Sequence, residues 1–183
     1  MATQSDSLSD DLQEWIGQQP LFFVATAAPQ GRVNVSPKGQ DSLRILSPTR
    51  LVWLNLTGSG NETAAHIKAA NRMTLMWCAF AGPPRILRVY GRTEIVHPRD
   101  ENWQECAEWL PPQAGARQYY VLEIDLVQTS CGYAVPLMEL TAERDVLTRW
   151  TEKRGPTGIE AYWRERNQFS IDGFPTDILM SPD

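Results

Sequence analysis

Apolar and polar side chains alternate with a period of two along several stretches of the chain, which is the spacing of half-buried β-strands. These stretches are residues 20–37, 49–56, 85–96 and 118–133, of which 118–133 is the longest. In the first stretch Pro29, Gln30 and Gly31 predict a tight turn, so it should form two strands. Residues 72–81 are so uniformly apolar that we expect a strand with both faces buried.

Helical spacing is confined to shorter segments. Ser9 is followed by two aspartates and by Leu12, Trp15 and Ile16 on one face, which predicts a short helix that ends near Gly17. Further helices are expected after a Gly-rich stretch at 57–60, over 98–110, and over two segments at 140–155 and 158–167.

About six strands at short spacing, with only small helices between them, favour an antiparallel barrel over a sheet wound through βαβ units. We therefore predict a mainly β fold of the α+β kind, an antiparallel six-stranded barrel with small flanking helices. No change of composition marks a linker, so residues 1–183 should form a single domain, with a helical C-terminal extension from about residue 137.

Composition limits the classes of function. Hydrophobic residues make up 42% of the 183 residues and the net charge is -5, which fits a globular protein and argues against nucleic acid as a partner. No stretch is long and apolar enough to span a bilayer, and the acidic N-terminus does not resemble a signal peptide. Three widely spaced cysteines without a Cys-x-x-Cys pair favour a cytoplasmic location, and two histidines leave little for a metal site, so we expect none.

The alternation of residues 33–37 ends at Lys38, which lies between Pro37 and Gly39. Pro37 fixes one backbone torsion and Gly39 relaxes the next, so the turn is shaped to aim the lysine. Two interpretations are open from these residues: a lysine in a solvated turn, or a lysine directed at an anion.

A second candidate is the Gly-rich loop at 57–60 and the helix start that follows it. Glycine lets a backbone approach an anion closely, and the N–H groups at a helix start attract negative charge. Asn61 and Thr63 add side-chain donors, whereas Glu62 would repel a phosphate unless it points outward or caps the helix. The loop lacks the Gly-Lys-Ser/Thr of a Walker motif, and a plain turn before a capped helix is the alternative interpretation.

No residue pattern supplies an evident acid, base or nucleophile. His66 is expected to hydrogen-bond locally, Cys131 has no cationic neighbour that would activate it, and there is no Gly-x-Ser-x-Gly elbow. Arg85 and Arg88 lie three residues apart and face opposite sides of their strand, so one of them can reach a ligand or a partner subunit. Catalysis would therefore have to come from a bound cofactor.

Taken together, these features resemble the pyridoxamine 5'-phosphate oxidase-like flavoproteins, the FMN-binding split-barrel family. The resemblance covers about residues 10–135 and runs through FFVATAAPQGRVNVSPKG, LVWLNLTGSGNETAAHIKAANRMTLMW and RILRVYGRTEIV. The motifs Ser-Pro-Lys-Gly, Asn-Glu-Thr and SIDGFP look closest to an uncharacterised oxidase-related branch. The resemblance implies a split β-barrel that forms a homodimer, with FMN at the subunit interface.

The resemblance also implies which residues contact the cofactor. Lys38 matches a lysine that helps hold the FMN phosphate, and residues 61–63 match the phosphate loop and helix start. Other positions match contacts to the flavin ring, and an arginine at residue 85 matches a strand that reaches the cofactor of the other subunit. The cofactor-binding positions implied in this way are Val35, Ser36, Pro37, Lys38, Asn55, Asn61, Glu62, Thr63, Arg85 and Ile86.

The chain departs from the family pattern at two places. Authentic pyridoxamine phosphate oxidases carry basic residues where Glu62 and Thr63 stand, and they end in an Arg-Leu-x-x-Arg stretch that is absent from NQFSIDGFPTDILMSPD. Without those arginines a substrate phosphate lacks its cationic clamp, so oxidation of a vitamin B6 phosphate is not expected.

We predict an FMN-dependent oxidoreductase that acts on an unidentified small molecule, with no assigned catalytic residue. Two alternatives stay open: a flavin- or haem-binding protein or sensor without turnover on the same barrel, and a deazaflavin-dependent reductase.

Overall fold

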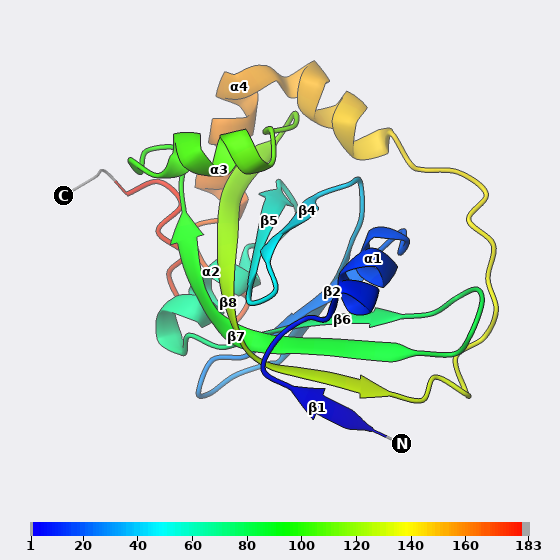
Figure 1. The fold of residues 1–183 in the computed structure, drawn as a ribbon. Helices are drawn as coiled ribbons and strands as arrows, with labels where there is room; N and C mark the ends of the chain where they lie inside the picture. Colours follow the sequence, from blue (N-terminus) through cyan, green and yellow to red (C-terminus); the bar gives the residue numbers. More distant parts are fainter. Residues whose placement is uncertain (1, 181–183) are drawn as a thin grey trace.

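The computed structural model describes residues 2–180, and Figure 1 shows an antiparallel sheet with helix α1 inside its curve and the other helices around it. The strands are β1 (Thr3–Ser5), β2 (Phe22–Thr26), β3 (Asn34–Lys38), β4 (Leu43–Ser47), β5 (Arg50–Leu56), β6 (Met73–Cys78), β7 (Ile86–Val96) and β8 (Ala116–Ser130). The helices are α1 (Asp10–Gly17), α2 (Glu62–Ala69), α3 (Trp103–Trp109) and α4 (Val146–Arg166). Residues 1 and 181–183, which the predicted domain includes, lie outside the described residues.

The sheet has the strand order β3-β2-β6-β7-β8-β5-β4, and β1 pairs with β8 beside this path. Every pairing is antiparallel, as the sequence predicts. The predicted number of six strands is wrong: the sheet has eight, and no ladder within residues 2–180 joins its end strands β3 and β4. Strands β1 and β4 were not predicted, because neither alternates between buried and exposed positions. All three residues of β1 are exposed, and all residues of β4 are half-buried.

Two clusters of apolar side chains hold the sheet. The larger one fills the concave side of the sheet, where the α1 side chains Leu12 and Ile16 pack against Trp53, Trp77 and their neighbours. The smaller one lies between the other face of β5 and α3, and it includes Val52, Leu54 and Cys106. Strand β5 is therefore buried on both faces, which explains its continuous apolar sequence.

Strand β6 was expected to be buried on both faces, and that expectation is wrong for the single chain. Met73, Leu75 and Trp77 are buried, but the alternate residues Thr74, Met76 and Cys78 are only half-buried. This second face of β6 is therefore covered only in part within the described chain, and its side chains stay partly in contact with solvent.

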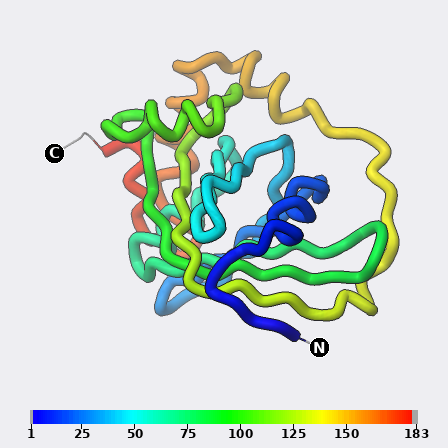
Figure 2. Tube along the Cα trace, in the orientation of Figure 1, coloured from blue at the N-terminus to red at the C-terminus, as the bar shows by residue number. Residues whose placement is uncertain are grey.

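The C-terminal part of the chain runs around the outside of the sheet before it returns to α2. Residues 131–145 form an extended strap with no helix or strand, visible in yellow in Figure 2. Helix α4 begins at Val146, later than the predicted boundary near 137, and it breaks at Gly155, where φ is 64° and Pro156 follows. The segment after α4 then lies beside α2, where Asp177 forms an ion pair with Lys68.

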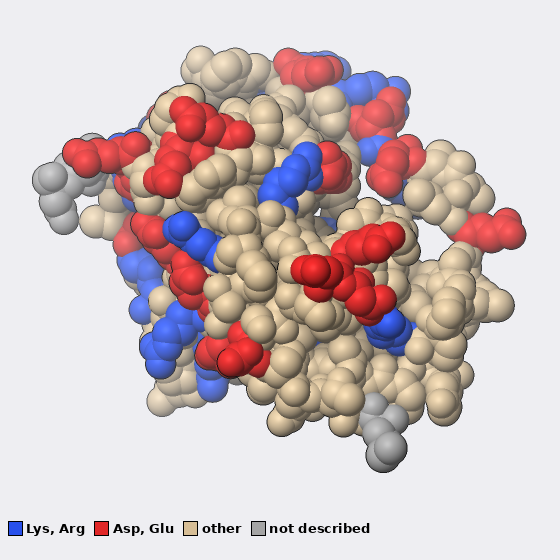
Figure 3. Space-filling model, viewed as in Figure 1, with Lys and Arg blue, Asp and Glu red and all other residues tan. Residues whose placement is uncertain are grey.

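Charged side chains of both signs are mixed on the face seen in Figure 3. The exception is the lower right of that view, over the ends of β6, β7 and β8, where few charged groups are present. Within the described residues, no helix has the length and hydropathy needed to cross a membrane.

The bulge between β7 and β8 generates a prediction about folding. At Gly91 the ladder shifts register, and an added Cβ would overlap the backbone carbonyl oxygen of Glu123. Because backbone atoms cannot move aside cheaply, Gly91→Ala should lower the free energy of unfolding by about 1–3 kcal/mol. Urea denaturation followed by tryptophan fluorescence measures this loss.

The matched control is Gly17→Ala at the end of α1, where nothing lies within 4 Å of an added Cβ. That variant should unfold at nearly the wild-type urea concentration. Equal midpoints for the two variants would contradict the importance of the close approach at Gly91.

Candidate functional site

A cavity of about 770 Å³ lies between β3, the Gly-rich loop at 57–60, the start of α2 and the segment that follows α4. Small-molecule sites commonly have volumes of about 300–1,000 Å³. The cavity is lined by Arg32, Val33, Asn34, Ser36, Lys38, Asn55, Leu56, Gly58, Ser59, Gly60, Asn61, Glu62, Thr63, His66, Arg117, Glu165, Arg166, Phe169, Ser170 and Ile171. Six of the ten predicted cofactor-binding residues are in this set.

Strand β3 presents alternate side chains to the cavity. Ser36 and Lys38 line it and are half-buried, whereas Val35 and Pro37 are exposed and do not line it. This division follows from the pleat of a strand, on which neighbouring side chains point to opposite faces. The structure thus brings Ser36 and Lys38 to the cavity, and the predicted ring contacts of Val35 and Pro37 stay predictions.

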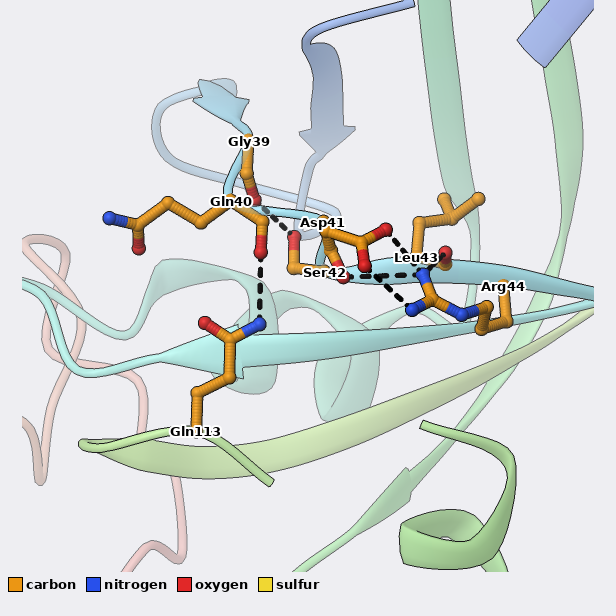
Figure 4. Close-up of polar contacts among 7 residues, drawn as sticks. All are labelled: Gly39, Gln40, Asp41, Ser42, Leu43, Arg44 and Gln113. Atoms are coloured by element: carbon orange, nitrogen blue, oxygen red, sulfur yellow. Dashed lines mark hydrogen bonds and ion pairs between the residues drawn. The ribbon is translucent and has the colours of Figure 1, made fainter. Parts of the chain in front are cut away.

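The turn after Lys38 is held by side chains, as Figure 4 shows. Ser42 Oγ donates to the Gly39 carbonyl at 2.7 Å, and Gln113 Nε2 donates to the Gln40 carbonyl at 2.9 Å. Gly39 was expected to provide the unusual backbone conformation, but positive φ angles occur at Gln40 (59°) and Asp41 (52°) instead. The Asp41 carboxylate also accepts hydrogen bonds from Arg44, so this strained turn is fixed from several sides.

Lys38 is a cation in a poorly solvated setting. Its Nζ lies 5.2 Å from the centre of the Trp53 ring, and Trp53 stacks on Tyr120. Burial lowers the pKa of Lys38 to about 8, and the positive charge of Arg117 acts in the same direction. The structure therefore contradicts the interpretation of Lys38 as a solvated lysine, and its contact with an anion stays a prediction.

Arg117, at the start of β8, is the second cation of the cavity and only 3% exposed. Its Nη1 donates to the Gly60 carbonyl at 2.9 Å and to Asn167 Oδ1 at 2.7 Å, while its Nε has no partner. Burial lowers the pKa of this guanidinium to about 10. Sequence analysis missed Arg117, although an arginine at the edge of the longest apolar strand was a usable signal.

Neither cation is balanced by an acidic partner. Among residues 2–180, no carboxylate forms an ion pair with Lys38 or Arg117. Two like charges that repel each other in a partly desolvated space are an unfavourable arrangement for the empty protein. The same arrangement is favourable for binding an anion.

The start of α2 adds donors to this part of the cavity. Asn61 is the N-cap residue, its side chain makes no capping hydrogen bond, and both of its polar side-chain atoms are buried without partners. Thr63, in the first turn, is buried and lines the cavity. The backbone N–H groups of a first helical turn have no partner within the helix, so they too are available to a negative group.

Glu62 lines the cavity, and its carboxylate is bound by the segment that follows α4. Both Oε atoms lie 3.1 Å from the backbone N of Ile171, which donates to them. The question left by the sequence is thereby answered: Glu62 turns toward the C-terminal segment and holds it in place.

Two further lining residues carry buried polar atoms without partners. Asn55 Nδ2 donates to Gln118 Oε1 at 3.2 Å and leaves its own Oδ1 unpaired. His66 Nδ1 lies 3.1 Å from Thr26 Oγ1 and leaves Nε2 unpaired, which agrees in part with the local hydrogen bond expected for this histidine. Buried polar atoms without partners are costly, so the cavity offers positions at which a polar ligand or ordered water is stabilised.

The Gly-rich loop owes its position to the end of α4. Trp163 Nε1 donates to Thr57 Oγ1 at 2.9 Å, and Asn167 Nδ2 donates to the Gly58 carbonyl at 3.1 Å. Asn167 also accepts from Arg117, so one buried amide connects the loop, the helix end and the second cation. Sequence analysis did not assign this role to any residue of the C-terminal extension.

The predicted residues Arg85 and Ile86 lie away from this cavity. Arg85 Nη1 pairs with Asp11 at 2.9 Å, and its guanidinium lies over the Trp15 ring. Ile86 pairs with Cys78 and Ser130 in the sheet. Because their expected contact was with the cofactor of a second subunit, it stays a prediction.

The chain is similar in sequence to known proteins over most of its length. The family model "Pyridoxamine 5'-phosphate oxidase" matches residues 8–131. The Pyridoxamine 5'-phosphate oxidase family protein ustO from Aspergillus flavus is 35% identical over 190 residues, which cover 93% of this chain and 76% of ustO.

Two solved structures show the same fold at low identity. A variant of HupZ from Group A Streptococcus has a TM-score of 0.56 and 16% identity, over 67% of this chain and 99% of HupZ. A Lactobacillus delbrueckii protein reported as a candidate pyridoxamine 5'-phosphate oxidase has a TM-score of 0.53 and 22% identity, over 67% of this chain and 94% of its own.

The family model covers nearly the whole sheet and both predicted phosphate-binding segments, and the ustO relative extends the likeness through the C-terminal extension. The similarity to known family members therefore extends over more than one of the motifs that suggested a flavoprotein. This chain is a member of the pyridoxamine 5'-phosphate oxidase family, the family of FMN-binding split barrels.

Proposed function

We propose that the protein binds FMN in the 770 Å³ cavity and acts as an FMN-dependent oxidoreductase on a small molecule. The observation that carries the proposal is the pair of cations Lys38 and Arg117 beside the start of α2, for which residues 2–180 provide no acidic partner. The phosphate of FMN supplies the missing negative charge. Asn61 and Thr63 would add hydrogen bonds to it from the helix start.

The residues that are present suit this cofactor. FMN joins a dianionic phosphate to a flat ring edged with carbonyl and amide groups. The cationic part of the cavity suits the phosphate, and Ser36 and Asn55 provide polar side chains for the ring edge. The unpaired Oδ1 of Asn55 and the unpaired side chain of Asn61 would gain partners from it.

The chain itself supplies binding and orientation. When bound, FMN provides the capacity to take up and release electrons and hydride, which no side chain of the cavity offers. Lys38 and Arg117 fix the phosphate, and the loop at 57–60 keeps the cofactor in register with β5. The segment at 169–171 limits access of water and substrate from the open side.

We also propose a homodimer with the cofactor near the subunit contact. The half-buried apolar face of β6 and the sparsely charged area in Figure 3 support a protein partner of the same kind. Arg85 would then reach the cofactor of the partner subunit from its place at the start of β7. The interface should exceed about 1,600 Å², and a monomer in light scattering would contradict the dimer.

A cytoplasmic location is a prediction from the cysteine pattern.

The absorption spectrum of the purified protein tests the cofactor. We expect a flavin spectrum and an FMN mass in the released ligand. A Soret band would instead favour a haem-binding protein, and the mass of a deazaflavin would favour a deazaflavin-dependent reductase.

Reduction of the bound flavin by NADH or NADPH under anaerobic conditions then separates an enzyme from a passive binder. Flavin that no tested donor reduces would contradict the oxidoreductase.

Replacement of Lys38 should weaken FMN binding. A hydrogen bond to a charged group contributes about 1.5–3 kcal/mol, so Lys38→Ala should raise the Kd for FMN roughly 10- to 150-fold. Fluorescence quenching of FMN by the apoprotein measures this Kd. Lys153→Ala is the matched control, since Lys153 is exposed on α4, and it should bind FMN like the wild type. Equal affinities of the two variants would contradict a phosphate contact by Lys38.

The affinity for FMN should fall at alkaline pH. The lowered pKa of Lys38 means that the ammonium loses its proton as pH rises through about 8, and the neutral amine attracts phosphate less. Between about pH 8 and 9.5 the Kd should rise, by at most about tenfold per pH unit. Titrations from about pH 6.5 to 9.5 measure the effect. The rise should be absent from Lys38→Ala, and an equal rise in that variant would assign it to another group.

A further inference from the structure

The open side of the cavity is formed by large apolar side chains. Val33, Phe169 and Ile171 line it with 70%, 60% and 73% of their surfaces exposed, whereas Arg117 and Asn61 are buried. Exposure therefore distinguishes two parts of one cavity, a polar and cationic floor and an apolar mouth. We call Val33, Phe169 and Ile171 the mouth residues.

The arginines near the mouth are already neutralised. The Asp172 carboxylate accepts from the Arg32 backbone N at 2.7 Å and also pairs with the Arg32 guanidinium. Arg166 Nε pairs with Glu165 at 2.9 Å. A phosphate or carboxylate at the mouth would have to compete with these carboxylates for the arginines, whereas an uncharged molecule displaces only water.

The backbone that carries Phe169 and Ile171 is held in one conformation. Ile171 N donates to Glu62, Ser170 N donates to the Phe174 carbonyl at 2.8 Å, and Phe174 N donates to Ser170 Oγ at 3.1 Å. A bridge between Phe169 and Pro175 closes the loop. The apolar side chains are therefore displayed on a fixed turn, and binding a ligand against them costs little ordering of the chain.

We propose that the mouth residues select an uncharged aromatic substrate, which packs between the bound flavin and the side chains of Phe169 and Ile171. The inference rests on the proposed function, since the cofactor forms the floor against which the substrate lies. It follows from charge complementarity: the cations that have no acidic partner in the described part of the chain lie at the floor, where the cofactor phosphate occupies them, and the mouth residues are uncharged. Aromatic rings stack favourably on such a surface, and the exposed apolar area is removed from water.

A matched pair of probes tests the inference on FMN-loaded protein. Equilibrium dialysis measures the Kd of 2-naphthol and of 2-naphthyl phosphate, which share one ring system and differ in charge. We expect 2-naphthol to bind at least about tenfold more tightly. Phe169→Ala should weaken 2-naphthol binding about tenfold, and Ile171→Arg should reverse the preference toward the phosphate. Leu137→Ala is the control, since Leu137 is an exposed apolar residue of the strap that does not line the cavity, and it should behave like the wild type.

Each outcome either supports or overturns the inference. Equal or tighter binding of 2-naphthyl phosphate by the wild type overturns it, and so does an unchanged 2-naphthol Kd in Phe169→Ala. Dissociation of a dimer by Phe169→Ala in light scattering would show that the mouth residues contact a second subunit, which also overturns it. Protein that retains FMN but shows no preference contradicts this inference alone, whereas protein that binds no FMN contradicts the proposed function and this inference with it.

Discussion

The organisation of the site depends on one electrostatic constraint, the presence of two cations in a space that water solvates poorly. Lys38 and Arg117 approach each other closely enough for the charge of Arg117 to lower the pKa of Lys38, and neither has an acidic partner among residues 2–180. The two cations stay close together because the surrounding elements fix the position of each side chain. The strained turn after β3 holds the lysine. Arg117 lies at a bulge between the pairs Asn55–Gln118 and Leu56–Ala116, and its hydrogen bonds to Gly60 and Asn167 hold it.

The remaining elements of the site are arranged around this pair. Asn167 accepts from Arg117 and donates to the Gly-rich loop, so the end of α4 positions the loop relative to the cations. Glu62 lines the cavity, and the backbone N of Ile171 donates to both oxygens of its carboxylate. The C-terminal extension thus has two effects: it completes the wall of the cavity and it fixes the position of the Glu62 carboxylate.

The sequence predicted those parts of the structure that depend on local chemistry. The period-two patterns, the turn around Gly31 and the Ser9 cap of α1 are each determined by neighbouring residues, and all were found. Lys38 and residues 61–63 were placed at one site through motifs, and they do line one cavity.

The parts that were missed depend on contacts between distant residues. Arg117 is far from Lys38 along the chain and stands in a strand pattern that gives no sign of its partner, and the roles of Asn167 and Ile171 depend on how the C-terminal segment returns to α2. The positive φ angles at Gln40 and Asp41 were missed for a related reason. Side chains from elsewhere, such as Gln113, hold that turn, and no local residue preference requires it.

The segment that follows α4 is held in place by its backbone and by some of its side chains. Ser170, Asp172 and Asp177 add side-chain contacts to the backbone hydrogen bonds, while Phe169 and Ile171 project away from the protein core. Exchange of either side chain therefore leaves the folding of the sheet almost untouched. Relatives built on this scaffold are free to diverge in what they accept through a few substitutions in one short turn, without any adjustment of the strands that carry the cations.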